Sequence, residues 1–462
     1  MSAFSNLIKR SVLLFVLIAV WVGVLWFGIR LDISRFNLLG LIGLHAGPPI
    51  LAWASWSIWR RRSEAAKIKT KESEQEQAEA AQKTQHESAQ RAFEETMRMR
   101  HFALDCRWAA VYSSQPDLVE DGTVALMPSS DGAASERLLA SLSQLLPDLF
   151  ESCPAARGLP IYIAESPTLD YAQAARVVAG CCHASNLPPI MALPASTTPG
   201  VADAIFSRFE SDPHLPGALF LAVDGPDVPC LGEDDDDQDD LTAQPKQADA
   251  MVALLFTHPN LDTALADIIT GAGRAENHQY DPMTPFWERN QRQLQGLSER
   301  LARLPEEVRT SLPELPVLGQ LRRPVEVSGK NQNSAWRNAI ERALINANLK
   351  QLSFEVEKGT VAATKKDTEE DIPCAWVVHN AGSYETSGDT LSLLGTGLSA
   401  HGIDLNIIRQ ATNVQADVKL GAVDQWASVA LALTQSQALH TTTLWATFGA
   451  CGAVGFVTNA KT

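Results

Sequence analysis

A short apolar stretch in the last quarter of the chain leads into polar side chains that could do chemistry. Residues 375–378 read AWVV, the run HNAGS follows, and a GD pair lies a few residues further on. His379 could act as a general acid or base, and Asn380, Ser383 and Asp389 could line the same polar pocket. The simpler alternative is that these side chains cap the loop with local hydrogen bonds.

A second group of possible ligands, Cys181, Cys182 and His183, suggests a metal site. Adjacent cysteines on a helix point about 100° apart, and the rest of a four-ligand set is not evident. We therefore expect core thiols and no metal.

Phosphate-binding loops of the GxxxxGK[ST] or GxGxxG type and a GxSxG elbow are absent from the sequence. Nucleotide binding and an intrinsic lipase are therefore unsupported, and we expect no cofactor.

Strands that alternate with helices would position these side chains. In the first half, the expected strands are residues 108–112, 159–164, 189–193, 218–224 and 251–257, and the expected helices are 134–149, 171–185 and 200–209. In the second half, the expected strands are 325–328, 375–378, 443–447 and 453–458, and the expected helices are 336–348, 390–401 and 424–439. This alternation predicts an α/β fold, with helices on both faces of a largely parallel sheet.

A polar stretch with five prolines, residues 262–321, separates the two halves. We expect a first α/β half at 101–261, a helical insertion at 262–321 and a second α/β half at 322–462. Residues 63–100 are rich in Glu, Gln, Ala and Lys and lack Gly and Pro, which favours a solvated helical spacer.

The N-terminal residues 1–62 resemble a membrane anchor of two helices. Residues 11–29 carry no charge, and about 20 apolar residues span a bilayer as a helix. Residues 38–59 form a second apolar segment that contains Pro48 and Pro49 and ends before three arginines. It either spans as well or lies on the membrane surface. Two spans would form a transmembrane hairpin, with membrane contact through residues 11–59 and, because Lys and Arg flank it, both termini in the cytoplasm.

Charge and cysteine usage narrow the class of protein further. The formal net charge is −16, with +6 in the first 62 residues and −22 in the rest. Because so acidic a body would repel a phosphate backbone, we expect no nucleic-acid partner. The acidic run at 233–240 lacks the spacing of a calcium loop, so we expect a solvated loop.

The seven cysteines show no CxxC spacing, which favours reduced thiols and a cytoplasmic body.

The order of motifs in the last 130 residues or so resembles the thiolase-like fold, specifically β-ketoacyl synthases. That family has an amphipathic helix, a strand into an HGTGT loop with a nearby GD, a Lys-rich GH segment that opens a helix, and a terminal strand pair carrying FGFGG and Asn. The corresponding features here are the helix at 336–348, HNAG with Gly388-Asp389, KLGA at 419–422 and FGACG at 448–452 with Asn459. The resemblance implies a two-half, layered thiolase-like fold.

The resemblance also implies a cysteine nucleophile and two histidines, and only one of these three groups is present. His379 matches the first histidine, whereas Ala422 stands where the second would be. The turn PASTTPG at 194–200, where the nucleophile would lie, contains no cysteine. Ser196 could line the same pocket, but nothing in the motif supplies a base for it. We therefore expect a degenerate body that is not an enzyme and has no catalytic residues.

The whole layout is similar to an uncharacterised family encoded beside type VI secretion lipase effectors. It has an N-terminal membrane hairpin, a helical spacer and an α/β body closing with WVVHNAG, QWASVALAL and a terminal GFV strand, which here are residues 376–382, 425–433 and 455–457. That resemblance implies an adaptor in the bacterial inner membrane that hands a secreted phospholipase-type effector to the spike protein. Two alternatives stay open: an acyl-transfer or acyl-binding enzyme that uses His379, and a structural inner-membrane scaffold.

Overall fold

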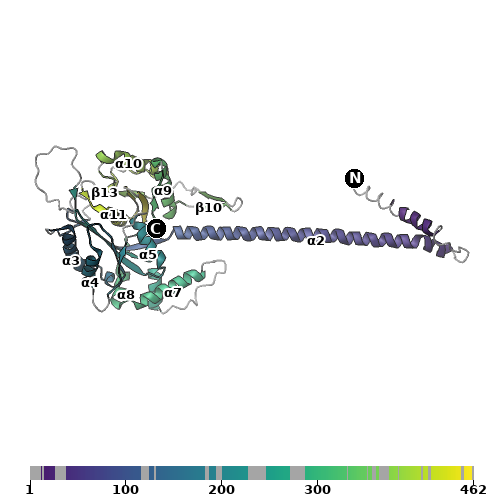
Figure 1. The fold of residues 1–462 in the computed structure, drawn as a ribbon, viewed down its shortest axis with the longest axis horizontal. Helices are drawn as coiled ribbons and strands as arrows, with labels where there is room; N and C mark the ends of the chain where they lie inside the picture. Colours follow the sequence, from purple (N-terminus) through teal and green to yellow (C-terminus); the bar gives the residue numbers. More distant parts are fainter. Residues whose placement is uncertain are drawn as a thin grey trace. The chain divides into compact units, whose positions relative to one another are not determined.

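Strands from both halves of the chain pair into one twelve-stranded sheet in the computed structural model (Figure 1). The structure describes residues 12, 15–25, 38–115, 124–128, 132–182, 187–193, 200–226, 246–270, 287–329, 331–350, 352–355, 360–363, 374–382, 384–406, 409–414, 418–448 and 452–459. The first-half strands are β1 (Ala103–Ser113), β2 (Val124–Leu126), β3 (Ile161–Ala164), β4 (Ile190–Leu193), β5 (Gly217–Asp224) and β7 (Ala250–Thr257). The second-half strands are β8 (Gly319–Arg322), β9 (Val325–Glu326), β12 (Cys374–His379), β13 (Ala411–Asn413), β15 (Thr442–Thr447) and β16 (Ala453–Thr458).

The two halves repeat one strand order. The first half runs β4-β3-β5-β7-β1 across the sheet and the second runs β13-β12-β15-β16-β8. When β2 and β9, which lie off this path, are left out, both halves read third, second, fourth, fifth, first in chain order. In both, the fifth strand, β7 or β16, is antiparallel to its two neighbours, while the second, third and fourth strands are parallel. This duplication confirms the predicted α/β architecture of two halves. The expectation of a largely parallel sheet is wrong, because β7 and β16 each run antiparallel to two neighbours and β1 pairs antiparallel with β8, so the sheet is mixed.

Helices cover both faces of each half, which gives five layers. The helices of the body are α3 (Ala134–Ser152), α4 (Tyr171–Cys181), α5 (Val201–Ser211), α6 (Leu261–Thr270), α7 (Trp287–Arg303), α8 (Glu306–Glu314), α9 (Gln332–Asn346), α10 (Tyr384–Ser399) and α11 (Asp424–Leu439). One apolar cluster joins α3 and α4 to the outer face of the first-half strands, and another joins α9 and α10 to the second-half strands. The third lies between the halves and contains α5 and α11. The layer order is therefore α-β-α-β-α.

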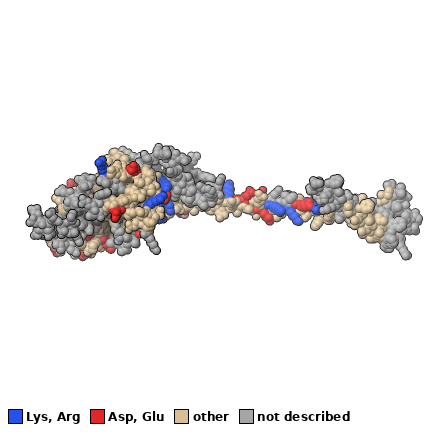
Figure 2. Space-filling view, turned by 90° about the horizontal axis from the view of Figure 1, so that it is seen from above, with Lys and Arg blue, Asp and Glu red and all other residues tan. Residues whose placement is uncertain are grey.

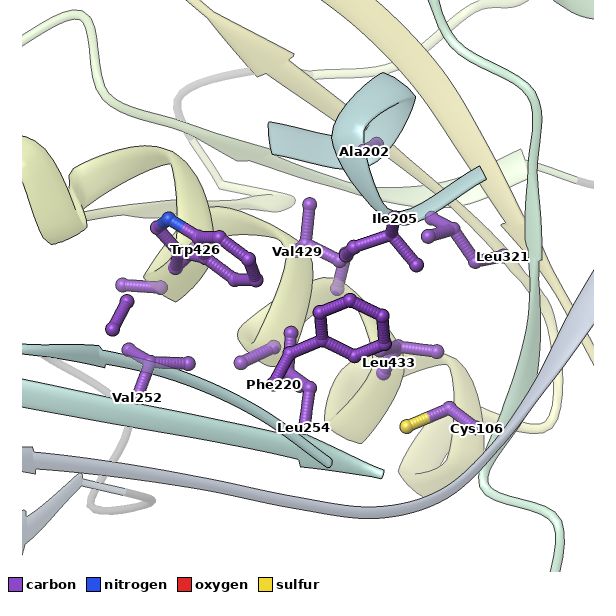
Figure 3. Packing of buried hydrophobic residues seen from close by; sticks show 14 of the residues in the cluster. Cys106, Ala202, Ile205, Phe220, Val252, Leu254, Leu321, Trp426, Val429 and Leu433 are labelled. Carbon is purple, nitrogen blue, oxygen red and sulfur yellow. The ribbon is translucent and has the colours of Figure 1, made fainter. Parts of the chain in front are cut away.

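The central layer is packed around Phe220 of β5. Its ring stacks on Tyr162 with centroids 5.2 Å apart and lies 6.3 Å from the ring of Trp426. Figure 3 shows this ring between α5 and α11, pointing toward Val429 and Leu433. Both faces of β5 and β7 are buried because helices cover them, which explains why these strands read as unbroken apolar runs rather than alternating ones.

A bulge in β1 bends the sheet where the two halves meet. The register of β1 against β7 shifts between Cys106 and Trp108, and bulges of this kind bend and twist a strand. Residues 103–106 of β1 pair with β8, so the bend lies next to the joint between the halves. The side chain of Arg107 at the bulge is buried and donates to the carbonyl oxygen of Leu315 at 3.0 Å and to Oδ1 of Asp262 at 2.6 Å. These two bonds connect the stretch between the halves, residues 262–321, to the bulge.

The chain consists of two compact units, Met1–Ala89 and Gln90–Thr462. The N-terminal unit contains helical residues 15–25 and most of α2 (Leu38–Arg100), which continues into the second unit. The indole Nε1 of Trp21 donates to the carbonyl oxygen of Leu44 at 2.9 Å, so the two helical segments are in contact. Figure 2 shows charged side chains of both signs interspersed along part of α2.

The structure changes three expectations about the elements. The second apolar segment and the spacer are one continuous helix, with Pro48 and Pro49 inside it. Strand β8 begins at Gly319, within the stretch for which only helices were expected. Two further pairs were not expected from the sequence: β10 (Leu352–Glu355) with β11 (Thr360–Ala363), and β6 (Lys246–Gln247) with β14 (Val418–Lys419).

No helix in the described part of the chain combines the length and the hydropathy needed to cross a bilayer. Residues 11–29 lie only partly within that part. The transmembrane hairpin stays a prediction.

Candidate functional site

His379 is the last residue of β12, where the strand pairs on one side with β13 and on the other with β15. It is 4% exposed, and burial lowers its pKa to about 4. Its Nδ1 accepts a hydrogen bond from the backbone N–H of Ala381 at 3.3 Å. The neutral ring therefore carries its proton on Nε2. At neutral pH this histidine is a neutral hydrogen-bond donor, and its low pKa makes it a weak base.

Asn380 ties the end of β12 to the end of β15. Its Oδ1 accepts from the backbone N–H of Phe448 at 2.6 Å, and its Nδ2 donates to the carbonyl oxygen of the same residue at 3.4 Å. The loop is held from the other side by Asn413, whose Nδ2 donates to the carbonyl oxygen of Gly382 at 2.7 Å. Gly382 has a φ of 90°, which favours glycine. These contacts match the loop-capping interpretation of Asn380.

Asp224 plays the corresponding part in the first half, at the end of β5. Its Oδ1 accepts from the hydroxyls of Ser166 and Thr168, each at 2.6 Å. Its Oδ2 accepts from the backbone N–H of Ala422 at 2.7 Å. Ala422 lies in the short 3-10 helix η4 (Gly421–Val423) that leads into α11. A first-half carboxylate is therefore bonded at the position where the family resemblance implies a second histidine.

The N-terminus of α5 is also occupied by a protein acceptor. Gly200 precedes this helix with a φ of 92°, and the backbone N–H of Val201 donates to Oε1 of Gln425 at 3.3 Å. Gln425 belongs to α11 of the other half. A helix N-terminus stabilises anions such as thiolates and oxyanions because its first N–H groups lack partners. Here an amide oxygen takes one of those N–H groups.

The described cysteines offer no activated nucleophile. They are Cys106, Cys153, Cys181, Cys182 and Cys374, and each is a free thiol. Burial raises the pKa of every one of them, to about 12 for Cys153 and Cys374 and to about 11 for Cys182. Thiols with raised pKa values stay protonated at neutral pH and are poor nucleophiles.

The other predicted site residues do not join His379. Asp389 lies in α10 with an exposed side chain, and Ser383, Ser196 and the acidic run at 233–240 fall outside the described residues. No cluster of three or more potential metal ligands occurs in the described ranges, and His183 lies outside them.

Sequence reasoning missed Asp224 and Gln425, which join the two halves. A signal for Asp224 was present, because a carboxylate ends the buried strand ALFLAVD. Gln425 stands within the QWASVALAL motif, but nothing in the sequence indicates that its amide reaches α5.

Comparisons with known proteins found weak structural similarity and no sequence match. No family model and no curated protein matches the sequence. The chain is similar in structure to human mitochondrial 3-ketoacyl-CoA thiolase, with 8% identity, a TM-score of 0.40 and coverage of 78% of this chain and 99% of that chain. For acetyl-CoA acetyltransferase from Syntrophomonas wolfei the identity is 8%, the TM-score 0.40 and the coverage 77% and 99%.

The peroxisomal 3-ketoacyl-CoA thiolase of Saccharomyces cerevisiae is similar at 10% identity and a TM-score of 0.39, over 77% of this chain and 97% of that chain. That enzyme is a five-layered α-β-α-β-α structure with two core domains of identical topology. In this chain, the layers and the duplication follow from its own strand pairing and its three apolar clusters. These likenesses have TM-scores of 0.40 or lower and lead to no conclusion about the fold or the activity of this chain.

Proposed function

We propose that the chain is a non-enzymatic adaptor, anchored in the bacterial inner membrane by residues 11–59, whose body binds a secreted phospholipase-type effector and helps load it on a spike protein. The resemblance of the sequence layout to the family encoded beside such effectors supplies the adaptor role. The soluble body then lies in the cytoplasm, where the seven cysteines stay reduced.

One observation carries the non-enzymatic part of this proposal. The two helix starts that face the joint between the halves are both bonded to side chains of the protein itself, Val201 to Gln425 and Ala422 to Asp224. Acyl transfer relies on preorganised N–H groups that stabilise the charge developing in the reaction, and one such group at each helix start is already bonded here. A body whose N–H donors at these helix starts form hydrogen bonds between its own two halves is suited to binding rather than to turnover.

The surface of the N-terminal unit supports the anchor. Many of the exposed large apolar side chains in the described residues lie between positions 12 and 59: Val12, Phe15, Val16, Val20, Val24, Ile42, Ile50, Leu51, Trp56, Ile58 and Trp59. A soluble surface rarely carries so many, so they call for a lipid or protein partner. Arg60 lies over the ring of Trp56 at 5.5 Å, as an aromatic belt and its flanking cation would.

Acyl binding is a second candidate, and one observation favours it. Because Nδ1 of His379 accepts from Ala381, Nε2–H is a donor, and no described residue accepts from it. A substrate carbonyl could take that bond. Binding without turnover requires neither of the two bonded N–H groups.

The adaptor proposal predicts a stable complex with the effector. The full chain carries a C-terminal affinity tag, is extracted from membranes and is produced together with the phospholipase-type effector and the spike protein encoded nearby. We expect the effector to be retained in equal amounts with the chain, and the spike protein only when the effector is present. Recovery of the chain with neither partner would refute the adaptor role and leave the structural scaffold. Recovery of the tagged chain from the soluble fraction would refute the anchor alone.

A further inference from the structure

A cavity of about 1200 Å³ lies at the end of α5 that is remote from the candidate site. The candidate site is at the N-terminal residue Val201, whereas the cavity is lined by Phe209 and Glu210 near the C-terminus of the helix. The remaining walls come from the last turns of α2, the residues after β7, and β8. Ligand pockets commonly measure about 300–1000 Å³, so the space is large enough for a small molecule.

One wall of the cavity is apolar. On α2, Phe93 and Met97 are four residues apart and half-buried, so they lie on one face of the helix. Phe102 continues this wall, with its ring centroid 6.3 Å from that of Phe206. Phe209 adds a further ring. Aromatic and aliphatic side chains of this kind suit a hydrocarbon chain.

A buried histidine whose donor has no acceptor among the described residues lines the cavity. His258 follows β7, is 5% exposed and lines the cavity. Its Nδ1 accepts from the backbone N–H of Asn260 at 3.1 Å, so the proton of the neutral ring is on Nε2. Burial, aided by His214, lowers the pKa of His258 to about 4, so the ring is neutral at pH 7. No described residue accepts a bond from Nε2.

Arg322 places a cation in the lining of the same cavity. Its Nε donates to the hydroxyl of Thr458 at 3.0 Å, one terminal nitrogen to the carbonyl oxygen of His101 at 3.1 Å, and the other to the amide oxygen of Gln320 at 2.8 Å. All three acceptors are neutral, and the carboxylate that interacts with Arg322 electrostatically is Asp105, which accepts a hydrogen bond from Gln320 at 2.9 Å. Because a guanidinium has five N–H donors, one on each terminal nitrogen has no acceptor among the described residues. Two donors on adjacent nitrogens match a carboxylate.

The acidic side chains of the lining favour a single negative charge. Glu210 is paired with Arg323, and Glu94 accepts a hydrogen bond from Gln90 at 3.0 Å. These carboxylates, together with Glu95, would repel a dianion more strongly than a monoanion.

We propose that this cavity binds a single-chain amphipathic carboxylate, with the carboxylate on Arg322 and His258 and the hydrocarbon chain along Phe93, Met97 and Phe102. The site is separate from the one at His379, and it does not depend on the adaptor role. It would give the body a way to sense or carry a fatty-acid-like molecule.

Calorimetric titration of the full chain in lipid nanodiscs tests this site, with empty nanodiscs as the blank. The probes share one chain length: octanoate, neutral octanamide, cationic octylammonium and octyl phosphate. We expect saturable 1:1 binding of octanoate, at least tenfold weaker binding of octanamide, no binding of octylammonium, and octyl phosphate no tighter than octanoate. Equal binding of octanoate and octanamide, or no saturable heat with octanoate, would overturn the proposal. Tighter octyl phosphate would overturn the carboxylate assignment.

Variants locate the site. Arg322→Gln should weaken octanoate binding at least tenfold, and His258→Asn, which keeps an acceptor for the Asn260 N–H, should weaken it severalfold. Arg303→Gln is the matched control, because Arg303 is exposed at the end of α7 and does not line the cavity. Unchanged octanoate binding in a folded Arg322→Gln protein would contradict the location. If that variant does not fold, the probe series on the unchanged chain decides the question.

Discussion

Replacing Arg137 with methionine should lower the free energy of unfolding by about 3–5 kcal/mol, because the change leaves a buried carboxylate without its partner. The side chain of Arg137 on α3 is 0% exposed and that of Asp249 is 5% exposed. Nε and Nη2 of the arginine donate to the two carboxylate oxygens at 2.9 and 2.7 Å, in a bidentate pair. Further bonds run to the carbonyl oxygens of Gly132 at 3.1 Å and Pro226 at 2.9 Å. Urea unfolding followed by circular dichroism measures the loss.

A double variant separates the lost charge partner from lost packing. Arg137→Met with Asp249→Leu removes both charges and should recover much of the stability, since apolar replacements of a buried pair are often neutral. Recovery should be incomplete, because two carbonyl oxygens stay without their donor. Ser143→Ala, an exposed position on the same helix, should change the free energy by less than about 0.5 kcal/mol. A single variant within 1 kcal/mol of the unchanged chain, or a double variant no better than the single, would disprove this account.

The second large effect is on the pH dependence of stability. The pKa of His379 is about 4 in the fold because of burial, against about 6.5 in an unfolded chain. Above pH 6.5 neither state binds the proton. As the pH falls from 6.5 toward 4, the unfolded state takes up a proton that the folded state does not, so stability falls. At pH 5 this costs about 2 kcal/mol. His379→Asn should therefore lose about 2 kcal/mol less than the unchanged chain between pH 7.5 and pH 5.

Asparagine is the suitable replacement because its side-chain oxygen can still accept from the N–H of Ala381. His258→Asn should behave in the same way, since the pKa of His258 is also about 4. Gln437→Ala, an exposed and uncharged change on α11, should shift stability equally at both pH values. Identical acid sensitivity of His379→Asn and the unchanged chain would mean that His379 titrates near its ordinary value, as a working acid or base would.

Much of the secondary structure could be predicted from the sequence. The bounds expected for β16 and for α11 are those observed, because each has a strong local pattern and clear ends. Strand β8 could not be predicted, since it is short and gains its stability from partners far away in the chain, β1 and β16. The continuity of α2 through Pro48 and Pro49 also ran against local propensity.

The candidate site was predictable only in part. A strand that ends in His379 is visible in the sequence, and so is the absence of a histidine at Ala422. The bonds that join the halves there, from Asp224 to Ala422 and from Gln425 to Val201, connect residues more than 190 positions apart. Local patterns carry no information about such pairs. The duplicated strand order is hidden for the same reason, because pairing between strands is decided by tertiary packing.

Acyl-thioester turnover tests the central claim most directly, that the site at His379 does not catalyse. The full chain is incubated with acetyl-CoA and with octanoyl-CoA, free thiol is followed by absorbance, and the intact protein is weighed by mass spectrometry. We expect thiol release equal to that without protein, the same in His379→Asn, and no acyl adduct on the chain. Thiol release by the unchanged chain would contradict this claim if His379→Asn abolishes the release and that variant still unfolds with normal cooperativity. The site would then be catalytic.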